Sequence, residues 1–132
     1  MEGVFLDANV LFSAAYKKTK LRSLWTLPKV TLLSSSYAVA EAETNLARER
    51  PEAVAELENL LKRVRVVKAT DSQSLPASIK LEDKDRPILM AAISASATHL
   101  LTGDIKHFGH LLGMRVEGLL ILTPAQYFQL VG

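Results

Sequence analysis

The stretch Val4-Phe5-Leu6-Asp7-Ala8-Asn9 (residues 4–9) begins as a short apolar run and changes abruptly at an acid. An apolar run of this length predicts a buried β-strand, and the acid marks the point where the strand ends. The stretch His99-Leu100-Leu101-Thr102-Gly103-Asp104 (residues 99–104) has the same arrangement near the other end of the chain. Both stretches therefore predict strands of a buried sheet, each followed by a carboxylate.

Strand-like and helix-like segments alternate along the rest of the chain. Further apolar runs predict strands at residues 30–33, 64–67 and 119–122. Helical spacing of apolar residues, together with helix-opening prolines, predicts helices at residues 20–27, 37–48 and 88–97, from Pro51, and from Thr123-Pro124, whereas residues 71–81 read as a loop. This alternation is typical of a parallel sheet covered on both faces. We therefore expect one α/β domain over residues 1–132, a three-layer α/β/α sandwich with a mainly parallel central sheet.

The composition fits such a domain and excludes several classes of protein. The chain has 132 residues, of which 48% are hydrophobic and 23% charged, an ordinary globular composition. Without cysteine it can form no disulfide, thiolate zinc site or iron–sulfur cluster. No apolar stretch approaches the roughly 20 residues that a membrane-spanning helix needs. Glu2 and Asp7 argue against a cleaved secretory signal, so we expect a soluble cytoplasmic protein that does not contact a membrane.

Asp7 and Asp104 each follow an apolar strand, and ligands of parallel sheets bind beyond the carboxyl ends of the strands. Taken singly, each acid has an ordinary explanation, because aspartate is common in the turn after a strand. Two carboxylates on one rim, however, repel each other unless a proton or a cation joins them. The pair therefore indicates a cation site.

Two further acids are candidates for the same site. Asp85 precedes a helix start, where helix capping alone would explain an acid, and it is preferred to Asp83 because it is nearer that start. Glu41 and Glu43 lie two residues apart on one helix, so at most one of them should enter the site. The face that carries Glu41 looks inward, where a carboxylate needs a partner, whereas Glu43 reads as a surface charge.

The net charge of +2 by itself indicates no more than a solubility charge. If four acids share one metal cluster, however, only ten of the 14 acids remain to balance 16 Lys and Arg residues. The rest of the surface would then be basic around one acidic pocket. That distribution suits a phosphodiester substrate, whose backbone needs both cationic contacts and a metal.

Four segments carry a resemblance to a known family: residues 5–11 (FLDANVL), 41–46 (EAETNL), 85–92 (DRPILMAA) and 101–108 (LTGDIKHF). In order and surroundings, these segments resemble the PIN-domain family, the fold of VapC-type toxins and other Mg²⁺-dependent nucleases. Together they span almost the whole chain. The resemblance implies a catalytic, metal-binding quartet for Mg²⁺ or Mn²⁺, made of Asp7, Glu41, Asp85 and Asp104 and supported by Asn9 and Thr102.

The resemblance further implies an endoribonuclease, in which a metal-activated water attacks the phosphorus of an RNA phosphodiester bond. It also implies a small antitoxin protein, as in a type II toxin–antitoxin pair, and a homodimer as partners. Many VapC-type toxins carry an acid or amide where this chain has His107, so we expect His107 to contact substrate or protein rather than the metal. The candidate RNA contacts are Lys17, Lys18, Lys20, Arg22, Lys106 and His107.

Two other functions stay open at this point. A non-catalytic PIN-like RNA-binding module would share the fold, although it has no physical need to crowd four acids. A haloacid-dehalogenase-like phosphatase also has an aspartate after its first strand, but usually carries Asp and Thr where Asn9 and Leu11 stand here. The apolar side chains of Leu24, Trp25 and Leu27 fit the core better than a dimer interface.

Overall fold

The computed structural model describes residues 2–17, 19–68 and 75–131. Its α-helices, 3₁₀ helices (η) and strands follow one another as β1 (Glu2–Leu6), α1 (Ala8–Tyr16), η1 (Lys20–Thr26), β2 (Val30–Ser35), α2 (Ser36–Glu49), η2 (Pro51–Ala53), α3 (Val54–Leu61), β3 (Val64–Val67), α4 (Arg86–Ser94), β4 (His99–Leu101), α5 (Ile105–Phe108), η3 (Gly109–Leu111), β5 (Arg115–Val116), β6 (Leu119–Leu122) and α6 (Pro124–Val131). Within these described ranges, no helix is long and apolar enough to cross a bilayer.

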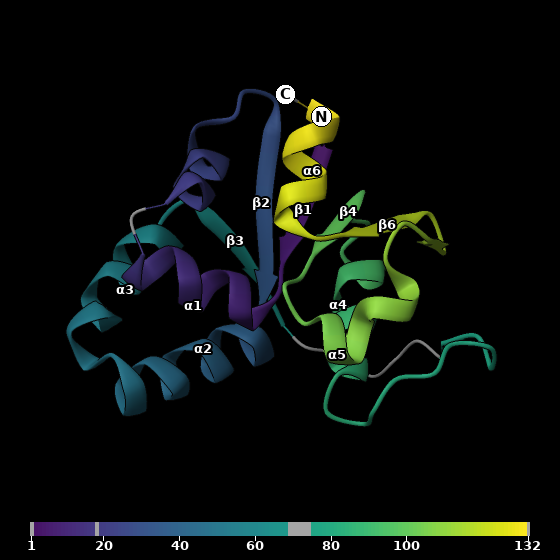
Figure 1. Ribbon diagram of the computed structural model, residues 1–132, viewed down its shortest axis with the longest axis horizontal. Helices are drawn as coiled ribbons and strands as arrows, with labels where there is room; N and C mark the ends of the chain where they lie inside the picture. The colour runs from purple at the N-terminus through teal and green to yellow at the C-terminus, as the bar shows by residue number, and fades with distance from the viewer. Residues whose placement is uncertain (1, 18, 69–74, 132) are drawn as a thin grey trace.

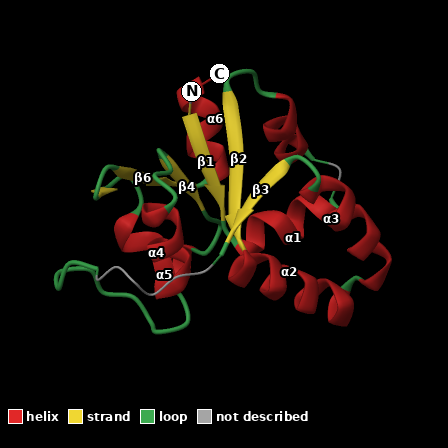
Figure 2. Ribbon diagram, turned by 180° about the vertical axis from the view of Figure 1, so that it is seen from behind, coloured by secondary structure: helices red, strands yellow, loops and turns green. Residues whose placement is uncertain are grey.

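The strands form one sheet in the order β3-β2-β1-β4-β6-β5. Neighbouring strands run parallel except β5, which is antiparallel to β6. Helices lie on both sides of the sheet, with α1, α2 and α3 on one side and α4 and α5 on the other (Figures 1 and 2). The prediction of an α/β fold with a mainly parallel central sheet is confirmed.

The position of β1 in the middle of the sheet decides where a ligand can bind. Its residues Val4, Phe5 and Leu6 are completely buried, as expected for a strand covered on both faces. The chain passes from β1 to β2 and β3 on one side, and then crosses to β4 on the other side of β1. Ligands of such sheets bind at this reversal, at the carboxyl ends of the two strands. Leu6 pairs with Leu101, so β1 and β4 end at the same level.

Some elements differ from the sequence-based prediction. Helix α1 was not predicted, because it follows β1 directly and is itself largely apolar, with Val10 and Leu11 buried. The two-residue strand β5 is too short to leave a periodic pattern. The helix expected at residues 20–27 is the 3₁₀ helix η1. The expected loop at 71–81 lies partly outside the described residues, since residues 71–74 are not described.

The apolar residues of η1 contribute to the core, as the sequence favoured. Leu24 is 1% exposed and belongs to the main hydrophobic cluster. The indole Nε1–H of Trp25 donates a hydrogen bond to the Leu60 carbonyl of α3 at 3.0 Å. Leu27 packs partly buried against the same cluster. The core packing that the sequence favoured for these three residues is therefore observed.

Candidate metal centre

Asp7 is fixed between the end of β1 and the start of α1. Its Oδ1 accepts a hydrogen bond from the Ala8 backbone N–H at 2.7 Å, which caps α1. Its Oδ2 accepts a second hydrogen bond from the Thr102 hydroxyl at 2.7 Å. Asp7 is only 5% exposed, so both carboxylate oxygens are held in a buried position at the carboxyl end of the sheet.

The loop after β4 joins Asp7 to Asp104. The Thr102 hydroxyl accepts a hydrogen bond from the Asp104 backbone N–H at 3.1 Å while it donates to Asp7. The Asn9 Oδ1 accepts a hydrogen bond from the Gly103 backbone N–H at 2.9 Å. Thr102 and Asn9 thus hold the two strand ends against each other. Their support of a metal ion stays a prediction.

Both carboxylate oxygens of Asp104 contact His107. Its Oδ1 accepts a hydrogen bond from the His107 backbone N–H at 3.1 Å and so caps α5. Its Oδ2 lies 2.7 Å from the imidazole Nδ1 of His107. The imidazole is 17% exposed and therefore faces the neighbouring carboxylates more than the solvent.

Asp85 occupies the N-cap position of α4, but its side chain forms no capping hydrogen bond within the described part of the chain. Its Oδ2 is buried, and no described residue donates a hydrogen bond to it. This oxygen lies 3.4 Å from His107 Nδ1. Helix capping, the ordinary explanation for an acid here, is therefore wrong for this side chain. Asp83, its rival in the sequence, is exposed.

Glu41 projects from α2 with an exposed side chain, so the expectation that it points inward is wrong. The nearby α2 residues Ala38 and Ala42 are the buried ones. Glu41 is still linked to the site electrostatically. Partial burial raises its pKa, and the carboxylates of Asp85 and Asp104 add to that rise. A role of Glu41 as a ligand stays a prediction.

Burial and neighbouring carboxylates disfavour the charged forms of Asp7 and Asp85. The pKa of Asp7 is raised to about 6, mainly by burial, with the carboxylates of Glu41 and Asp104 adding to the rise. Burial likewise raises the pKa of Asp85, and the carboxylates of Asp104 and Glu82 contribute. A cation would relieve this repulsion. Carboxylate oxygens, among them the buried Oδ2 of Asp85, suit a hard divalent ion, so the residues fit such a metal.

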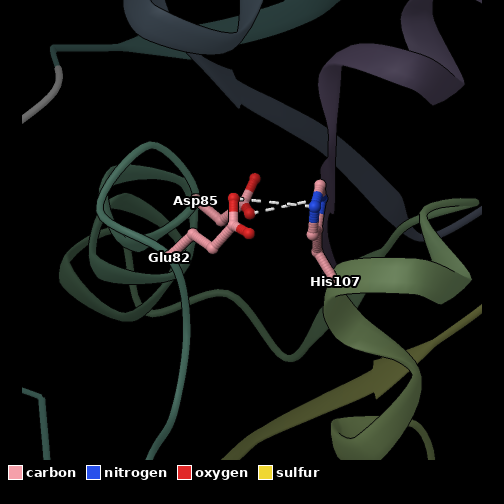
Figure 3. Close-up of side chains that lie close together, drawn as sticks. All are labelled: Glu82, Asp85 and His107. Atoms are coloured by element: carbon pink, nitrogen blue, oxygen red, sulfur yellow. Dashed lines mark ion pairs between the residues drawn. The ribbon is translucent and has the colours of Figure 1, made fainter.

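One set of possible ligands among the described residues has all its ligand atoms within 4.8 Å of one another, namely Glu82, Asp85 and His107. The predicted quartet does not form so tight a set. Figure 3 shows the carboxylates of Glu82 and Asp85 facing the nitrogens of the His107 imidazole. Glu82 was not predicted from the sequence, and the only signal that could have found it is its position three residues before Asp85.

Two more residues near the site were also missed. The Tyr37 hydroxyl donates a hydrogen bond to the Lys84 carbonyl at 2.7 Å and so ties α2 to the segment before α4. The positive charge of Lys84 lowers the pKa of Glu41 and Asp85, against the larger effect of burial. Neither residue stands in a recognisable motif. Their place beside the acids depends on how α2 and α4 pack, which the sequence does not show.

Among the described residues, Lys106 is the one predicted lysine or arginine that lies beside the acids. Lys106 lines an open cleft together with Lys80, Glu82 and His107. Lys17 and Lys20 follow the C-terminal end of α1, whereas Asp7 caps its N-terminal end. The two ends are separated by the 9 residues of α1, and each residue adds about 1.5 Å along the helix axis. Lys17 and Lys20 therefore lie away from Asp7.

Two of the predicted RNA contacts need separate comment. Arg22 serves the fold rather than an open surface, because it donates hydrogen bonds to the carbonyls of Ala14 and Ala15 in the last turn of α1. Its guanidinium also pairs with Glu56 at 3.0 Å. Lys18 lies outside the described residues.

Comparison with known families gives this arrangement its context. Residues 3–106 match the model of a family described as PIN domain. The chain belongs to the PIN-domain family. The matched part of this PIN domain runs from β1 into α5 and contains all four predicted acids. Membership in this family removes the haloacid-dehalogenase-like alternative.

Solved structures with the same PIN fold include proteins from three bacteria. VapBC2 from Rickettsia felis, bound to a DNA fragment from its promoter, has a TM-score of 0.65 at 18% identity, over 92% of this chain and 98% of that one. VapBC-1 from nontypeable Haemophilus influenzae has a TM-score of 0.58 at 19% identity, over 92% and 97% of the chains. Mycobacterium tuberculosis VapC20, described as a Sarcin-Ricin loop cleaving toxin, has a TM-score of 0.57 at 16% identity, over 78% and 92%. No curated protein matches the sequence significantly.

Proposed function

We propose that this PIN domain is a Mg²⁺- or Mn²⁺-dependent endoribonuclease that hydrolyses RNA phosphodiester bonds. The observation that carries the proposal is that Asp7 and Asp104 follow the ends of β1 and β4 and both bond to Thr102, while Asp85 faces His107 beside Asp104. The buried Oδ2 of Asp85 receives no hydrogen bond from a described residue. The family supports nuclease chemistry, and the fold shared with a toxin described as cleaving the Sarcin-Ricin loop supports RNA as the substrate.

Asp7, Asp85 and Asp104 would hold the ion, with Glu41 at the rim. When bound, such an ion polarises the phosphodiester and lowers the pKa of a water molecule. Thr102 keeps the Asp7 Oδ2 in place by donating its hydroxyl hydrogen. The exposed carboxylate of Glu41, with its raised pKa, is suited to take up the proton of the attacking water.

Removal of divalent metal should abolish the activity. We expect purified protein to cleave an end-labelled RNA internally with Mn²⁺ or Mg²⁺, to lose all cleavage in excess EDTA, and to recover it when Mn²⁺ is restored. Product lengths on a sequencing gel distinguish internal cleavage from trimming of the ends. Cleavage that continues unchanged in EDTA would exclude the metal-dependent mechanism. A protein that binds RNA but never cleaves it would support the non-catalytic module.

The biological role that we propose is the toxin of a type II toxin–antitoxin pair. The Rickettsia and Haemophilus structures with this fold are VapBC proteins, which supports a small antitoxin as partner. A short reading frame for a DNA-binding protein immediately upstream, whose co-expression relieves growth arrest by this chain, would support the role. Growth unaffected by the cleavage-competent chain would contradict it. Cytoplasmic location and a homodimer belong to the same proposal.

We expect the basic residues beside the acids to hold the RNA. Lys80 and Lys106 are exposed and line the cleft next to Glu82. The double variant Lys80→Ala, Lys106→Ala should weaken RNA binding and lower the slope of log affinity against log salt by about 1 to 2. Fluorescence anisotropy over a salt series measures both quantities. The matched control is Lys17→Ala, Lys20→Ala at the far end of α1, and an equal loss in that control would refute this placement of the RNA.

A further inference from the structure

His107 of α5 faces two carboxylates of the segment that leads into α4. Its Nε2 lies 3.6 Å from the Glu82 Oε2, and its Nδ1 lies 3.4 Å from the Asp85 Oδ2. Glu82 and Asp85 belong to the segment that leads into α4, whereas His107 belongs to α5. Figure 3 shows both carboxylates directed at the nitrogen-bearing edge of the ring. Asp85 and His107 were among the residues predicted from the sequence, whereas Glu82 and the grouping of the three were not.

Asp104 determines which imidazole nitrogen is free. Its Oδ2 lies 2.7 Å from His107 Nδ1, and a carboxylate oxygen can only accept a hydrogen bond there. Nδ1 therefore carries the hydrogen, and in the neutral ring Nε2 presents a lone pair toward Glu82. Histidines that bind metals are oriented in this way, with the remaining N–H donated to a carboxylate.

The spacing of the facing atoms suits a shared metal ion. With metal–ligand distances of about 2.0–2.2 Å, adjacent ligand atoms on one ion lie roughly 3 Å apart. The 3.6 Å between His107 Nε2 and Glu82 Oε2 is close to that value, and the Glu82 side chain is 61% exposed and free of the tight packing that would prevent adjustment. The buried Asp85 Oδ2, to which no described residue donates a hydrogen bond, supplies a further acceptor.

We propose that His107, through Nε2, joins Glu82 and Asp85 in binding a divalent ion, for which Asp104 orients the ring rather than serving as a ligand, and makes this centre select Mn²⁺ over Mg²⁺. The proposal rests on the proposed metal-dependent function and adds a nitrogen ligand to it. Mg²⁺ binds oxygen almost exclusively, whereas first-row transition ions accept imidazole. A site of carboxylates alone would not discriminate in this way. His107 is then a ligand rather than the substrate contact expected from the sequence.

Direct metal binding without RNA tests the proposal. We expect calorimetric titration of the metal-free protein to show Mn²⁺ binding at least about tenfold more tightly than Mg²⁺. His107→Asn keeps an N–H for Asp104 but removes Nε2, so it should weaken Mn²⁺ binding by about 10- to 100-fold. Mg²⁺ binding should change by less than about threefold. Electron spin-echo spectra of the Mn²⁺-loaded parent should show ¹⁴N modulation that disappears in His107→Asn.

The matched control is His110→Gln. His110 lines the same cleft, and its Nε2 lies 2.7 Å from the Lys80 carbonyl, a contact that the glutamine amide can replace. This variant should keep the parent's preference for Mn²⁺ and its ¹⁴N modulation. If His107→Asn weakens both ions equally, His107 only orients the carboxylates and the proposal is overturned. If the parent binds both ions but His107→Asn changes neither affinity, the proposal fails while the metal-dependent function stands. If the parent binds neither ion, both fail.

Discussion

Cleavage of RNA in the presence of Mn²⁺ is expected to fall at least about 10²- to 10³-fold when Asp104 is replaced by Asn. The amide can still accept the hydrogen bond from the His107 backbone N–H that begins α5. It removes, however, one of the negative charges that would hold the ion between the ends of β1 and β4. Single-turnover cleavage of an end-labelled RNA measures the loss, and circular dichroism shows whether the fold is kept.

The control for this variant is Glu43→Gln on α2. Glu43 is exposed and lies two residues from Glu41, so the substitution removes one acid without touching the site. The activity of Glu43→Gln should equal that of the parent. Purification of both variants by the same procedure also reveals any contaminating ribonuclease, which would remain in Asp104→Asn. If Asp104→Asn, free of contaminant, cleaves as fast as the parent, the site assignment is wrong.

The second large effect concerns stability. In metal-free protein at pH 7.5, Asp7→Asn is expected to raise the free energy of unfolding by about 1 to 3 kcal/mol. Asp7 is 5% exposed, and its pKa is raised from 3.8 to about 6. Its charged form is therefore disfavoured in the folded protein. The asparagine keeps an oxygen for the Ala8 backbone N–H and carries no charge. Its amide nitrogen can donate to the Thr102 hydroxyl, which then accepts at the place where it donated to Asp7.

The stabilising effect of Asp7→Asn should depend on pH with a defined sign. Between about pH 4 and pH 6 the folded protein holds a proton on Asp7 that the unfolded chain has released, so the stability of the parent falls as the pH rises through this window. Above about pH 6 the whole penalty is present, and below about pH 4 it is absent. The difference between Asp7→Asn and the parent should therefore be largest at neutral pH and vanish at acidic pH.

Thermal unfolding at pH 7.5 and pH 4, with and without Mn²⁺, measures this effect. The variant should melt several degrees above the parent at pH 7.5 without metal. Saturating Mn²⁺ should raise the melting temperature of the parent more than that of the variant, because only the parent keeps the full set of carboxylates. A variant that is less stable than the parent at pH 7.5 without metal would refute the burial of an uncompensated charge at Asp7.

Sequence patterns predicted the structure correctly where neighbouring residues alone determine it. The apolar runs before Asp7 and Asp104 predicted β1 and β4, and both acids do follow the strands at the same edge of the sheet. Of Asp85 and Asp83, Asp85 is half-buried with a buried Oδ2, whereas Asp83 is exposed, and the choice of Asp85 as the site residue stays a prediction. Each of these inferences needed only the residues next to one another in the chain.

Inferences about side-chain direction were less successful. Glu41 was expected to face inward, but it is exposed at the rim, because helical spacing alone does not show which side of α2 the neighbouring elements cover. The ordinary capping role of Asp85 was wrong for a similar reason. Its carboxylate is turned toward His107, a residue of α5 that no local pattern connects to α4.

The sequence by itself determined the fold class and the acids that end strands, because burial periodicity and chain-local chemistry suffice for both. Only the tertiary structure decided that β1 and β4 are neighbours and that the Thr102 hydroxyl reaches Asp7 across 95 positions of the chain. Strand order depends on how every crossover packs against the sheet, which no single segment encodes. The same packing brings Glu82 close to His107, and any metal selectivity of this pair therefore depends on the tertiary structure as well.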